Sequence, residues 1–502
     1  MTGFTPAQTG FSRLWLTEGR ARPDHKPSYE SCHVLSGMDE DAGTPEPIKC
    51  PDPTRYGYFV TQDQILPVPS DPTTEITGRY AVDIASTLKR LKDQGCALDL
   101  QAHMGDCEDP MDFNAGFQKA LIIEGARLTN WSTDALGSVE EGAAVNETSA
   151  VTAVQTYEVL PLTITERAED TVVNAIRDVV ICDRVGCGEC DDESDGCQII
   201  YSLADAAAGS PGTPGDVIYS LDGGATHASN EIDTLDASEA PSAIACLGQY
   251  VVVISNDSDS LHYKTKAAIN AGTVGGWTEV TTGFVAAGSP RDIWSVGTMA
   301  FICGDGGYLY SCVDPTLGVT VLDAGITTTD DLYAVHAISE QRAVAVGDSD
   351  SIVYTENGTE WQVGDATGGG GTNQCVWMHS EKVWFVGDTS GNFYYTLDKA
   401  DNWTAKALPG APGGVYDVAF STQSVGYVSG INTAGTGGYA ARTYDGGYSW
   451  VVLPEGPGSL PGTPGFLQAL AACVEDANMA VFVGGVGTIG AATDGIILIG
   501  KD

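Results

Sequence analysis

The feature that most constrains this 502-residue chain is a unit of about 45 residues that recurs through its second part. Each copy holds a short β-type run around an anchor residue. The anchors are Tyr219, Tyr263, Tyr310, Tyr354, Tyr395, Arg442 and Ala491, separated by 44, 47, 44, 41, 47 and 49 residues. Repeats of this length that consist of short β-strands are typical of the four-stranded blades of a β-propeller. Seven of them predict a closed ring.

The amino-acid sequence before each anchor repeats as well. An alternating strand is followed by an apolar strand of small and β-branched residues that ends in Gly or Gly-Asp, as in Ala300–Asp305, Ala343–Asp348, Val383–Asp388 and Val425–Gly430. Such strands suit packing near a central axis, and the aromatic strands suit the layers between blades. The sequence therefore predicts a seven-bladed β-propeller over residues 198–502, with Gln198–Leu203 completing the last blade.

Four turns in this region carry a related motif. Thr443-Tyr-Asp445-Gly-Gly447-Tyr-Ser-Trp450 follows the pattern S/T-x-D-x-G-x-S/T-W, and Ser220–His227 follows it with His in place of Trp. The runs from Thr396 and Thr355 are degraded copies. The region thus resembles the Asp-box (BNR) propellers of sialidases and of photosystem-assembly-factor-type proteins. The resemblance implies structural roles in hairpins, with Asp capping backbone N–H groups, Gly at positive φ and Trp packed beneath, for Asp222, Asp398, Asp445, Gly447, Trp403 and Trp450.

The Asp-box is a folding element and does not indicate an enzyme. A sialidase needs three arginines for its substrate carboxylate, and the predicted propeller contains Arg291, Arg342 and Arg442. None has the expected sequence context, so we expect structural roles for them. The seven histidines form no metal or catalytic spacing. We expect no enzymatic activity, with a sialidase-like glycosidase or a glycan-binding protein as the alternative.

Four cysteines crowd into sixteen residues, with the spacing C-x4-C-x2-C-x6-C: Cys182, Cys187, Cys190 and Cys197. Thiolates at this spacing are able to wrap a tetrahedral ion, so one interpretation is a structural zinc site. Local disulfides and free thiols are the other two interpretations. The cluster marks a predicted joint, residues 181–197, between two regions of different composition.

Residues 1–180 read as an α+β domain that resembles a small β-sandwich. Strands are predicted at Thr74–Tyr80, Ala97–His103, Leu121–Leu128 and Ser149–Leu160. A helix is predicted at Ile84–Gln94, because Ile84, Leu88 and Leu91 share one face.

The layout of residues 10–180, with the acidic, small-residue segment from Leu136 to Val151, resembles the tail tube proteins of long-tailed double-stranded DNA phages. The resemblance implies self-assembly into hexameric rings or tubes and contact with other virion proteins.

The chain has 67 acidic and 24 basic residues and a net charge of −43. Nucleic-acid binding and docking to anionic lipid both need basic patches, so the charge argues against these partners. No secretory signal or membrane-spanning run is visible in the sequence. The function expected is that of a virion structural protein, assembled in the host cytoplasm, whose external propeller contacts surface glycans or a partner. A soluble propeller scaffold for a protein partner remains an alternative.

Overall fold

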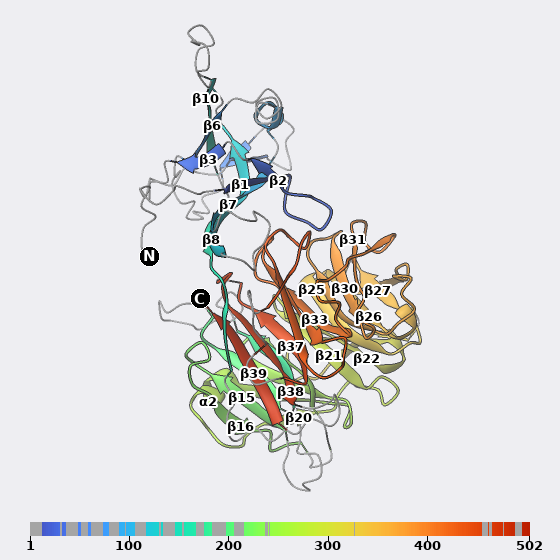
Figure 1. Ribbon diagram of the computed structural model, residues 1–502. Helices are drawn as coiled ribbons and strands as arrows, with labels where there is room; N and C mark the ends of the chain where they lie inside the picture. The colour runs from blue at the N-terminus through green and yellow to red at the C-terminus, as the bar shows by residue number, and fades with distance from the viewer. Residues whose placement is uncertain are drawn as a thin grey trace, which may run out of the picture. The chain divides into compact units, whose positions relative to one another are not determined.

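The computed structural model describes residues 13–501, apart from 31–32, 37–48, 52–58, 62–73, 80–89, 96, 106–116, 130–131, 134–145, 153–154, 167–174, 183–196, 205–214, 236–238, 240, 326, 454–459, 461–463, 475 and 487–493. The chain is mainly β and divides into two compact units, Met1–Pro161 and Leu162–Asp502 (Figure 1). In the described part, no helix has the length and apolar character needed to cross a membrane.

The N-terminal unit is built from antiparallel strands. Its strands are β1 (Arg13–Glu18), β2 (Ser28–Glu30), β3 (His33–Ser36), β4 (Lys49–Pro51), β5 (Phe59–Thr61), β6 (Thr74–Arg79), β7 (Leu98–Gly105), β8 (Phe117–Leu128), β9 (Ser132–Thr133), β10 (Asn146–Thr152) and β11 (Gln155–Val159). Nine of them form one branched sheet of order β2-β1-β7-β8-β10-β6-β3, with β11 beside β8 and β9 beside β10. Strands β4 and β5 pair separately.

Several sequence predictions for this unit are confirmed. Strands β6, β7 and β8 lie where alternation predicted them, and the run predicted as one long strand forms β10 and β11. Residues 90–94 are helical, and Leu91 packs with Leu98, Leu100 and Leu121 in the core. The start of the predicted helix and most of the acidic insert lie outside the described residues. The described strands pair as one nine-stranded sheet and the separate β4–β5 hairpin.

The C-terminal unit consists, in its described residues, of seven four-stranded antiparallel sheets, numbered here as blades 1 to 7. Their first strands are β13 (Ile176–Ile181), β17 (Pro241–Leu247), β21 (Pro290–Val296), β25 (Leu332–Ser339), β29 (Asn373–Met378), β33 (Gly414–Phe420) and β37 (Phe466–Ala472). The second strands are β14 (Ile200–Ala204), β18 (Tyr250–Ser255), β22 (Met299–Gly304), β26 (Arg342–Gly347), β30 (Trp384–Asp388), β34 (Gly426–Ile431) and β38 (Ala480–Val486).

The third strands of blades 1 to 6 carry the first six anchors of the repeat, and Ala491 lies outside the described residues. The third strands are β15 (Asp216–Ser220), β19 (Ser260–Thr265), β23 (Tyr308–Cys312), β27 (Ile352–Thr355), β31 (Phe393–Thr396), β35 (Gly438–Thr443) and β39 (Asp494–Lys501). The fourth strands are β16 (Ala228–Glu231), β20 (Thr278–Val280), β24 (Thr320–Ala324), β28 (Trp361–Val363), β32 (Trp403–Ala405), β36 (Val451–Val452) and, in blade 7, β12 (Thr163–Glu166). A short helix, α2 (Lys266–Asn270), follows β19.

The first strands contact one another in a closed circle, from β13 through β17, β21, β25, β29 and β33 to β37 and back to β13. The ring predicted from the repeat is therefore present. Two details of the prediction are wrong. The boundary lies at Pro161–Leu162 and not near residue 180, and the ring is closed by β12 pairing with β39, whereas Ile200–Ala204 is the second strand of blade 1.

The core of this unit lies between neighbouring blades. The second strands are apolar on both faces because each blade packs against two others. Val251, Val252, Val253 and Ile254 of β18, for example, are fully buried, and they divide between the clusters shared with blade 1 and with blade 3.

Candidate binding cavity on the ring axis

Every first strand of the C-terminal unit contains a β-bulge close to its start. The pairing register with the second strand shifts at the same place in all seven blades. A bulge re-aims one side chain of the strand. The bulge residues are Arg177, Ser242, Arg291, Tyr333, Gln374, Tyr416 and Gln468; all are partly exposed and all line one cavity of about 740 Å³. We call this set the entrance ring.

In four blades a glycine on the second strand makes room for the bulge. In blade 4, a Cβ at Gly347 would collide with the carbonyl oxygen of Asp331, directly before β25. The corresponding glycines of β22, β34 and β38 face a backbone carbonyl in the same way. In these blades the Gly ending seen in the repeat marks the bulge, whereas Ala204 and Ser255 pair at this place in blades 1 and 2.

The residue after each bulge forms the next level of the cavity wall. Its members are Asp178, Ala243, Asp292, Ala334, Cys375, Asp417 and Ala469, which we call the carboxylate tier. The three aspartates stand on blades 1, 3 and 6, and each is followed on the next blade by an alanine.

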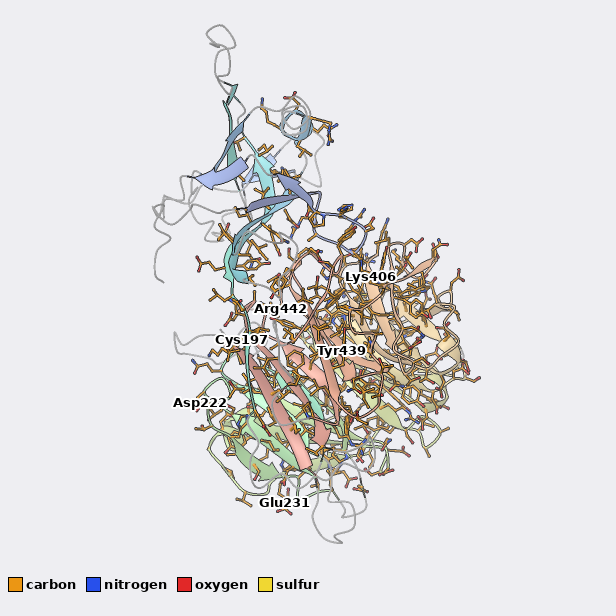
Figure 2. The ribbon with its side chains drawn as sticks, viewed as in Figure 1. Cys197, Asp222, Glu231, Lys406, Tyr439 and Arg442 are labelled. Carbon is orange, nitrogen blue, oxygen red and sulfur yellow. A yellow bond between two sulfur atoms is a disulfide. The ribbon has the colours of Figure 1, made fainter. Side chains whose placement is uncertain are left out.

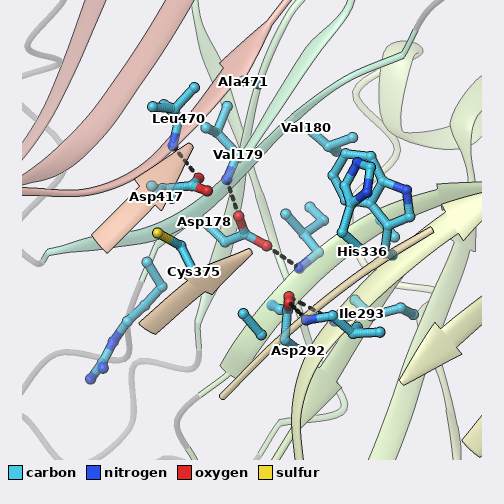
Figure 3. A pocket seen from close by; sticks show the side chains of 18 of the residues that line it. Asp178, Val179, Val180, Asp292, Ile293, His336, Cys375, Asp417, Leu470 and Ala471 are labelled. Atoms are coloured by element: carbon cyan, nitrogen blue, oxygen red, sulfur yellow. Dashed lines mark hydrogen bonds between the residues drawn. The ribbon is translucent and has the colours of Figure 1, made fainter. Parts of the chain in front are cut away.

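Each aspartate of the carboxylate tier ties two blades together (Figure 3). One oxygen of Asp178 accepts from its neighbour Val179 N at 2.7 Å, and the other accepts from Ile244 N of blade 2 at 2.8 Å. Asp292 makes the same pair of bonds with Ile293 N and Val335 N, both at 2.8 Å.

Asp417 repeats the arrangement with Val418 N and Leu470 N, both at 2.7 Å. Burial raises the pKa of Asp178 to about 7, with the Asp292 carboxylate adding to the effect, and raises that of Asp292 to about 6. Burial also raises the pKa of Asp417 well above its usual range, despite its backbone hydrogen bonds. The cavity wall thus holds three partly exposed carboxyl groups whose surroundings disfavour the charged form.

Two residues further along each first strand, the wall becomes aromatic on one side. The members of this aromatic tier are Val180, Ala245, Trp294, His336, Trp377, Ala419 and Ala471. The His336 ring lies 4.3 Å from the Trp294 ring and 4.1 Å from the Trp377 ring, between centroids. The bulky side chains come from consecutive blades 3, 4 and 5, while the remaining blades contribute small side chains.

The entrance ring is electrostatically mixed. Arg291 forms ion pairs with Asp305 and with Asp331, the latter at 3.3 Å, and its guanidinium lies 4.6 Å from the Tyr333 ring centroid. Its charge is therefore balanced locally. In the described part of the chain, no group of three or more His, Cys, Asp or Glu side chains is arranged to hold a metal ion.

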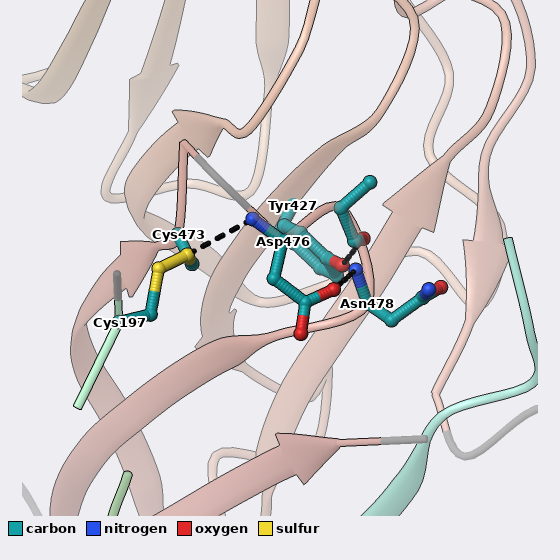
Figure 4. The surroundings of a disulfide bond; sticks show 6 residues. Cys197, Tyr427, Cys473, Asp476 and Asn478 are labelled. Carbon is teal, nitrogen blue, oxygen red and sulfur yellow. Dashed lines mark hydrogen bonds between the residues drawn. A yellow bond between two sulfur atoms is a disulfide. The ribbon is translucent and has the colours of Figure 1, made fainter. Parts of the chain in front are cut away.

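The cysteine cluster does not form the zinc site that its spacing suggested. Cys182 is bonded to Cys246 across 64 residues, with a Cα–Cα distance of 6.3 Å. Cys197 is bonded to Cys473 across 276 residues, with a Cα–Cα distance of 5.9 Å (Figure 4). The sulfurs of Cys182 and Cys197 are therefore not available to a metal ion. Both bridges are long-range, not local. Both bridges fasten blade 1, one to blade 2 and the other to blade 7. Cys187 and Cys190 lie outside the described residues.

The hairpin residues lie at turns between third and fourth strands, away from the cavity. Asp445 is 4% exposed and accepts hydrogen bonds from Ser449 N at 2.8 Å, Ser449 Oγ at 2.6 Å and Thr443 Oγ1 at 2.9 Å. Gly447 has a φ of 88°, and a Cβ there would meet the Phe385 ring at 2.7 Å. Trp450 is 7% exposed and packs edge-on against Phe393 of blade 5.

Asp222 makes the corresponding bonds with Thr226 N, Thr226 Oγ1 and Ser220 Oγ in an exposed turn (Figure 2). The hydrogen bonds from Thr226 lower the pKa of Asp222 to about 2. Asp398 bonds with Asn402 and Thr396, and Trp403 Nε1 donates to Asp365 O at 2.8 Å.

No protein-family model matches this sequence, and no curated protein matches it. Among solved structures, virginiamycin B lyase from Staphylococcus aureus matches over 68% of this chain and 100% of its own, with 8% identity and a TM-score of 0.50. The chain contains a β-propeller. YCF48 from Cyanidioschyzon merolae matches over 67% of this chain and 98% of its own, with 13% identity and a TM-score of 0.48. At such identities the likeness concerns the fold alone.

The structure does not bring together the three arginines considered in the sequence for a sialidase site. Arg291 is on the entrance ring, whereas Arg342 pairs with Glu356 and Glu381 at 3.7 and 3.1 Å and does not line the cavity. Arg442 is fully buried and donates to Ala477 O at 2.8 Å and to Asn478 Oδ1 at 3.2 Å (Figure 2). The arginine cluster that a sialidase needs is not assembled from these residues.

Sequence reasoning missed the propeller's carboxylate tier. In the sequence, each of its aspartates stands near the start of a first strand, after a polar residue and before a β-branched one. The three segments are Arg177-Asp178-Val179, Arg291-Asp292-Ile293 and Tyr416-Asp417-Val418. In so acidic a chain this pattern stands out only after the first strands are aligned.

Proposed function

We propose that this chain is a non-enzymatic binding and assembly protein whose propeller takes a segment of a partner protein at the entrance ring. The observation that carries the proposal is the repeated bulge, by which all seven blades supply a partly exposed side chain to one cavity. A site made by the whole ring is rigid, because every contributor is anchored in a sheet. Its volume of about 740 Å³ is in the range of cavities that enclose a ligand group.

The composition of the entrance ring supports a protein partner. It contains two arginines, two tyrosines, two glutamines and one serine. Arg and Tyr are enriched at protein interfaces, because each combines a large contact area with directional hydrogen bonding. The aspartates beneath the ring already accept backbone N–H groups from two blades, which supports a role in positioning the wall and not in catalysis.

We further propose that the hairpins around Asp222, Asp398 and Asp445 are Asp-boxes that hold the outer strands. Their bonds between the carboxylate, the residue two before it and the residue four after it support this assignment.

For the N-terminal unit we propose the role of a tail-tube-like assembly domain of a virion. Support comes from the sheet, in which β2 pairs with β1 alone and β3 pairs with β6 alone among the described strands. Free strand edges are able to pair between the subunits of a ring. The strong negative charge suits a tube through which DNA passes, because it repels phosphates.

Assembly is tested by negative-stain electron microscopy and light scattering of the full chain. Rings or tubes with projecting knobs support the virion role, and a single species of about 52 kDa contradicts spontaneous tube formation.

Binding is tested by selecting random displayed peptides on the full chain. Peptides recovered on the wild type should fail to bind Gln374→Trp and Gln468→Trp, which obstruct the entrance ring, and should still bind Trp403→Leu, which lies outside the cavity. Recovery of glycans but not peptides on parallel arrays would replace the protein partner with a surface sugar. Absence of any selected ligand would contradict the binding role.

A further inference from the structure

We propose that the cavity binds an organic cation, an ammonium or guanidinium group on an apolar stem, held between the carboxylate tier and the two indoles of the aromatic tier. This inference rests on the proposed binding role and specifies the chemistry of the group that enters. The same chemistry is carried by a Lys or Arg side chain of a partner and by a free small amine.

The first support is the carboxylate tier itself, because burial raises the pKa of its three aspartates and a bound cation would favour their ionised form. Asp178, Asp292 and Asp417 point into one cavity wall, and the other four members of the tier are alanines and a cysteine (Figure 3). No basic side chain belongs to this level. Each carboxylate oxygen accepts one backbone N–H group, so it retains a lone pair for a second donor.

The spacing of the carboxylates favours an organic cation over a metal ion. They stand on blades 1, 3 and 6, each fixed by bonds to a different neighbouring blade. Guanidinium and ammonium groups present several N–H donors in different directions, and such donors suit acceptors distributed around a wall.

The aromatic tier supplies a surface for the stem and for the charge. The Trp294 and Trp377 rings are 5.6 Å apart at an interplanar angle of 85°, and both are partly exposed and line the cavity. The remaining blades contribute the smaller side chains of Val180, Ala245, Ala419 and Ala471 to this tier. A cation above an indole face is attracted by the ring quadrupole, most strongly where water is excluded.

His336 completes the aromatic tier beside the two indoles. It is 3% exposed, and its Nδ1 accepts a hydrogen bond from Met378 N at 3.1 Å. Burial lowers the pKa of His336 to about 3, so its ring is neutral and adds no positive charge that would repel a bound cation.

The test is isothermal titration of the full chain with N-acetyl-arginine amide and with N-acetyl-citrulline amide, which has nearly the same shape but no charge. The arginine compound should bind about tenfold or more tightly, as expected for a charge-assisted contact. Agmatine, which lacks the amide oxygens, separates the two sources. Tighter binding of N-acetyl-arginine amide than of agmatine indicates a peptide side chain. Tighter binding of agmatine than of N-acetyl-arginine amide indicates a free amine.

Two substitutions locate the site. Asp292→Ala gives blade 3 the residue that blades 2, 4 and 7 already have, and Trp377→Leu removes one indole. Each should weaken binding of the arginine compound by about tenfold, within the range of cation–π and charged contacts. The controls Asp222→Ala and Trp403→Leu change a carboxylate and an indole outside the cavity and should leave affinity unchanged. Thermal melts establish that each variant is folded.

Equal affinity for the arginine and citrulline compounds, or affinity that none of the folded cavity variants changes, would overturn the inference. Peptides without Lys or Arg that bind wild type but not Gln374→Trp would also overturn it while the proposed binding role stands. If the chain binds neither the compounds nor any peptide, both proposals fail.

Discussion

The Oδ2 atom of Asp178 accepts a hydrogen bond from the backbone N–H of Ile244, 2.8 Å away and 66 residues further along the chain. This contact joins the first strands of blades 1 and 2 at the wall of the central cavity. The equivalent bonds of Asp292 and Asp417 join blades 3 to 4 and 6 to 7. The same three side chains therefore join neighbouring blades and line the cavity.

Stability should depend on pH through this tier. Burial raises the pKa of Asp178 to about 7, so the folded chain holds a proton that the unfolded chain releases above about pH 4. Its stabilising contribution is complete below pH 4 and is lost as the pH rises to 7. Asp292 and Asp417 face it with pKa values raised in the same direction, and Arg177 and Arg291 lie on the entrance ring above.

Asp178→Ala should consequently flatten the pH dependence of the unfolding free energy between pH 4.5 and 7.5, by up to about 1.4 kcal/mol per pH unit for one proton. Urea melts across this range measure it. Asp222→Ala is the control, because hydrogen bonds lower the pKa of Asp222 to about 2, below the range tested. Parallel slopes for wild type and Asp178→Ala would show that this carboxyl ionises normally.

Ring closure should depend on the two disulfides. Cys197–Cys473 connects blade 1 to blade 7, and its loss removes a cross-link spanning 276 residues. Cys197→Ala/Cys473→Ala should lower the unfolding free energy by about 2–5 kcal/mol. Cys312→Ala, which removes a buried free cysteine of blade 3, serves as the control for loss of a sulfur without loss of a bridge. Identical melts for wild type with and without reductant would contradict both bridges.

The hairpin carboxylates should differ in importance because they differ in burial. Asp445→Ala leaves the N–H and hydroxyl of Ser449 without their acceptor in a buried turn, and should cost about 1–3 kcal/mol. Asp222→Ala exposes the equivalent groups of Thr226 to water and should cost less than about 1 kcal/mol. Chemical denaturation of both variants provides the comparison, and equal costs would argue against burial as the deciding factor.

Replacing Arg442 should lower the free energy of unfolding. Arg442→Met strips Ala477 O and Asn478 Oδ1 of buried hydrogen bonds and removes contacts with the Tyr427 and Tyr444 rings. We expect a loss of about 3 kcal/mol. Arg342→Met breaks partly exposed ion pairs and should cost about 1 kcal/mol or less. A stable Arg442→Met that loses binding would instead indicate a functional arginine.

The repeat made the propeller predictable because its third strands carry aromatic anchors at even spacing. Tyr219, Tyr310 and Tyr395, for example, lie on β15, β23 and β31. The glycine before Asp348 was visible too, but its reason, the close approach of the Asp331 carbonyl, appears when β25 and β26 are paired.

Blade 1 and the ring closure were harder to predict. The first and second strands of blade 1 are separated by the segment that contains the cysteine cluster, so Ile176–Ile181 reads as part of the preceding domain. Strand β12 is four residues long, and its partner Leu498 is more than 300 residues from Glu166. Local spacing likewise cannot reveal that Cys182 and Cys197 pair with Cys246 and Cys473, because chain folding brings these partners together.

The central claim, that the entrance ring is the binding face, is tested most directly by hydrogen–deuterium exchange of the full chain with and without a selected peptide. We predict protection at the starts of β17, β21 and β29, where Ser242, Arg291 and Gln374 stand, and no change at β16, β32 and β36. Protection confined to the outer strands, with the first strands unchanged, would contradict the account.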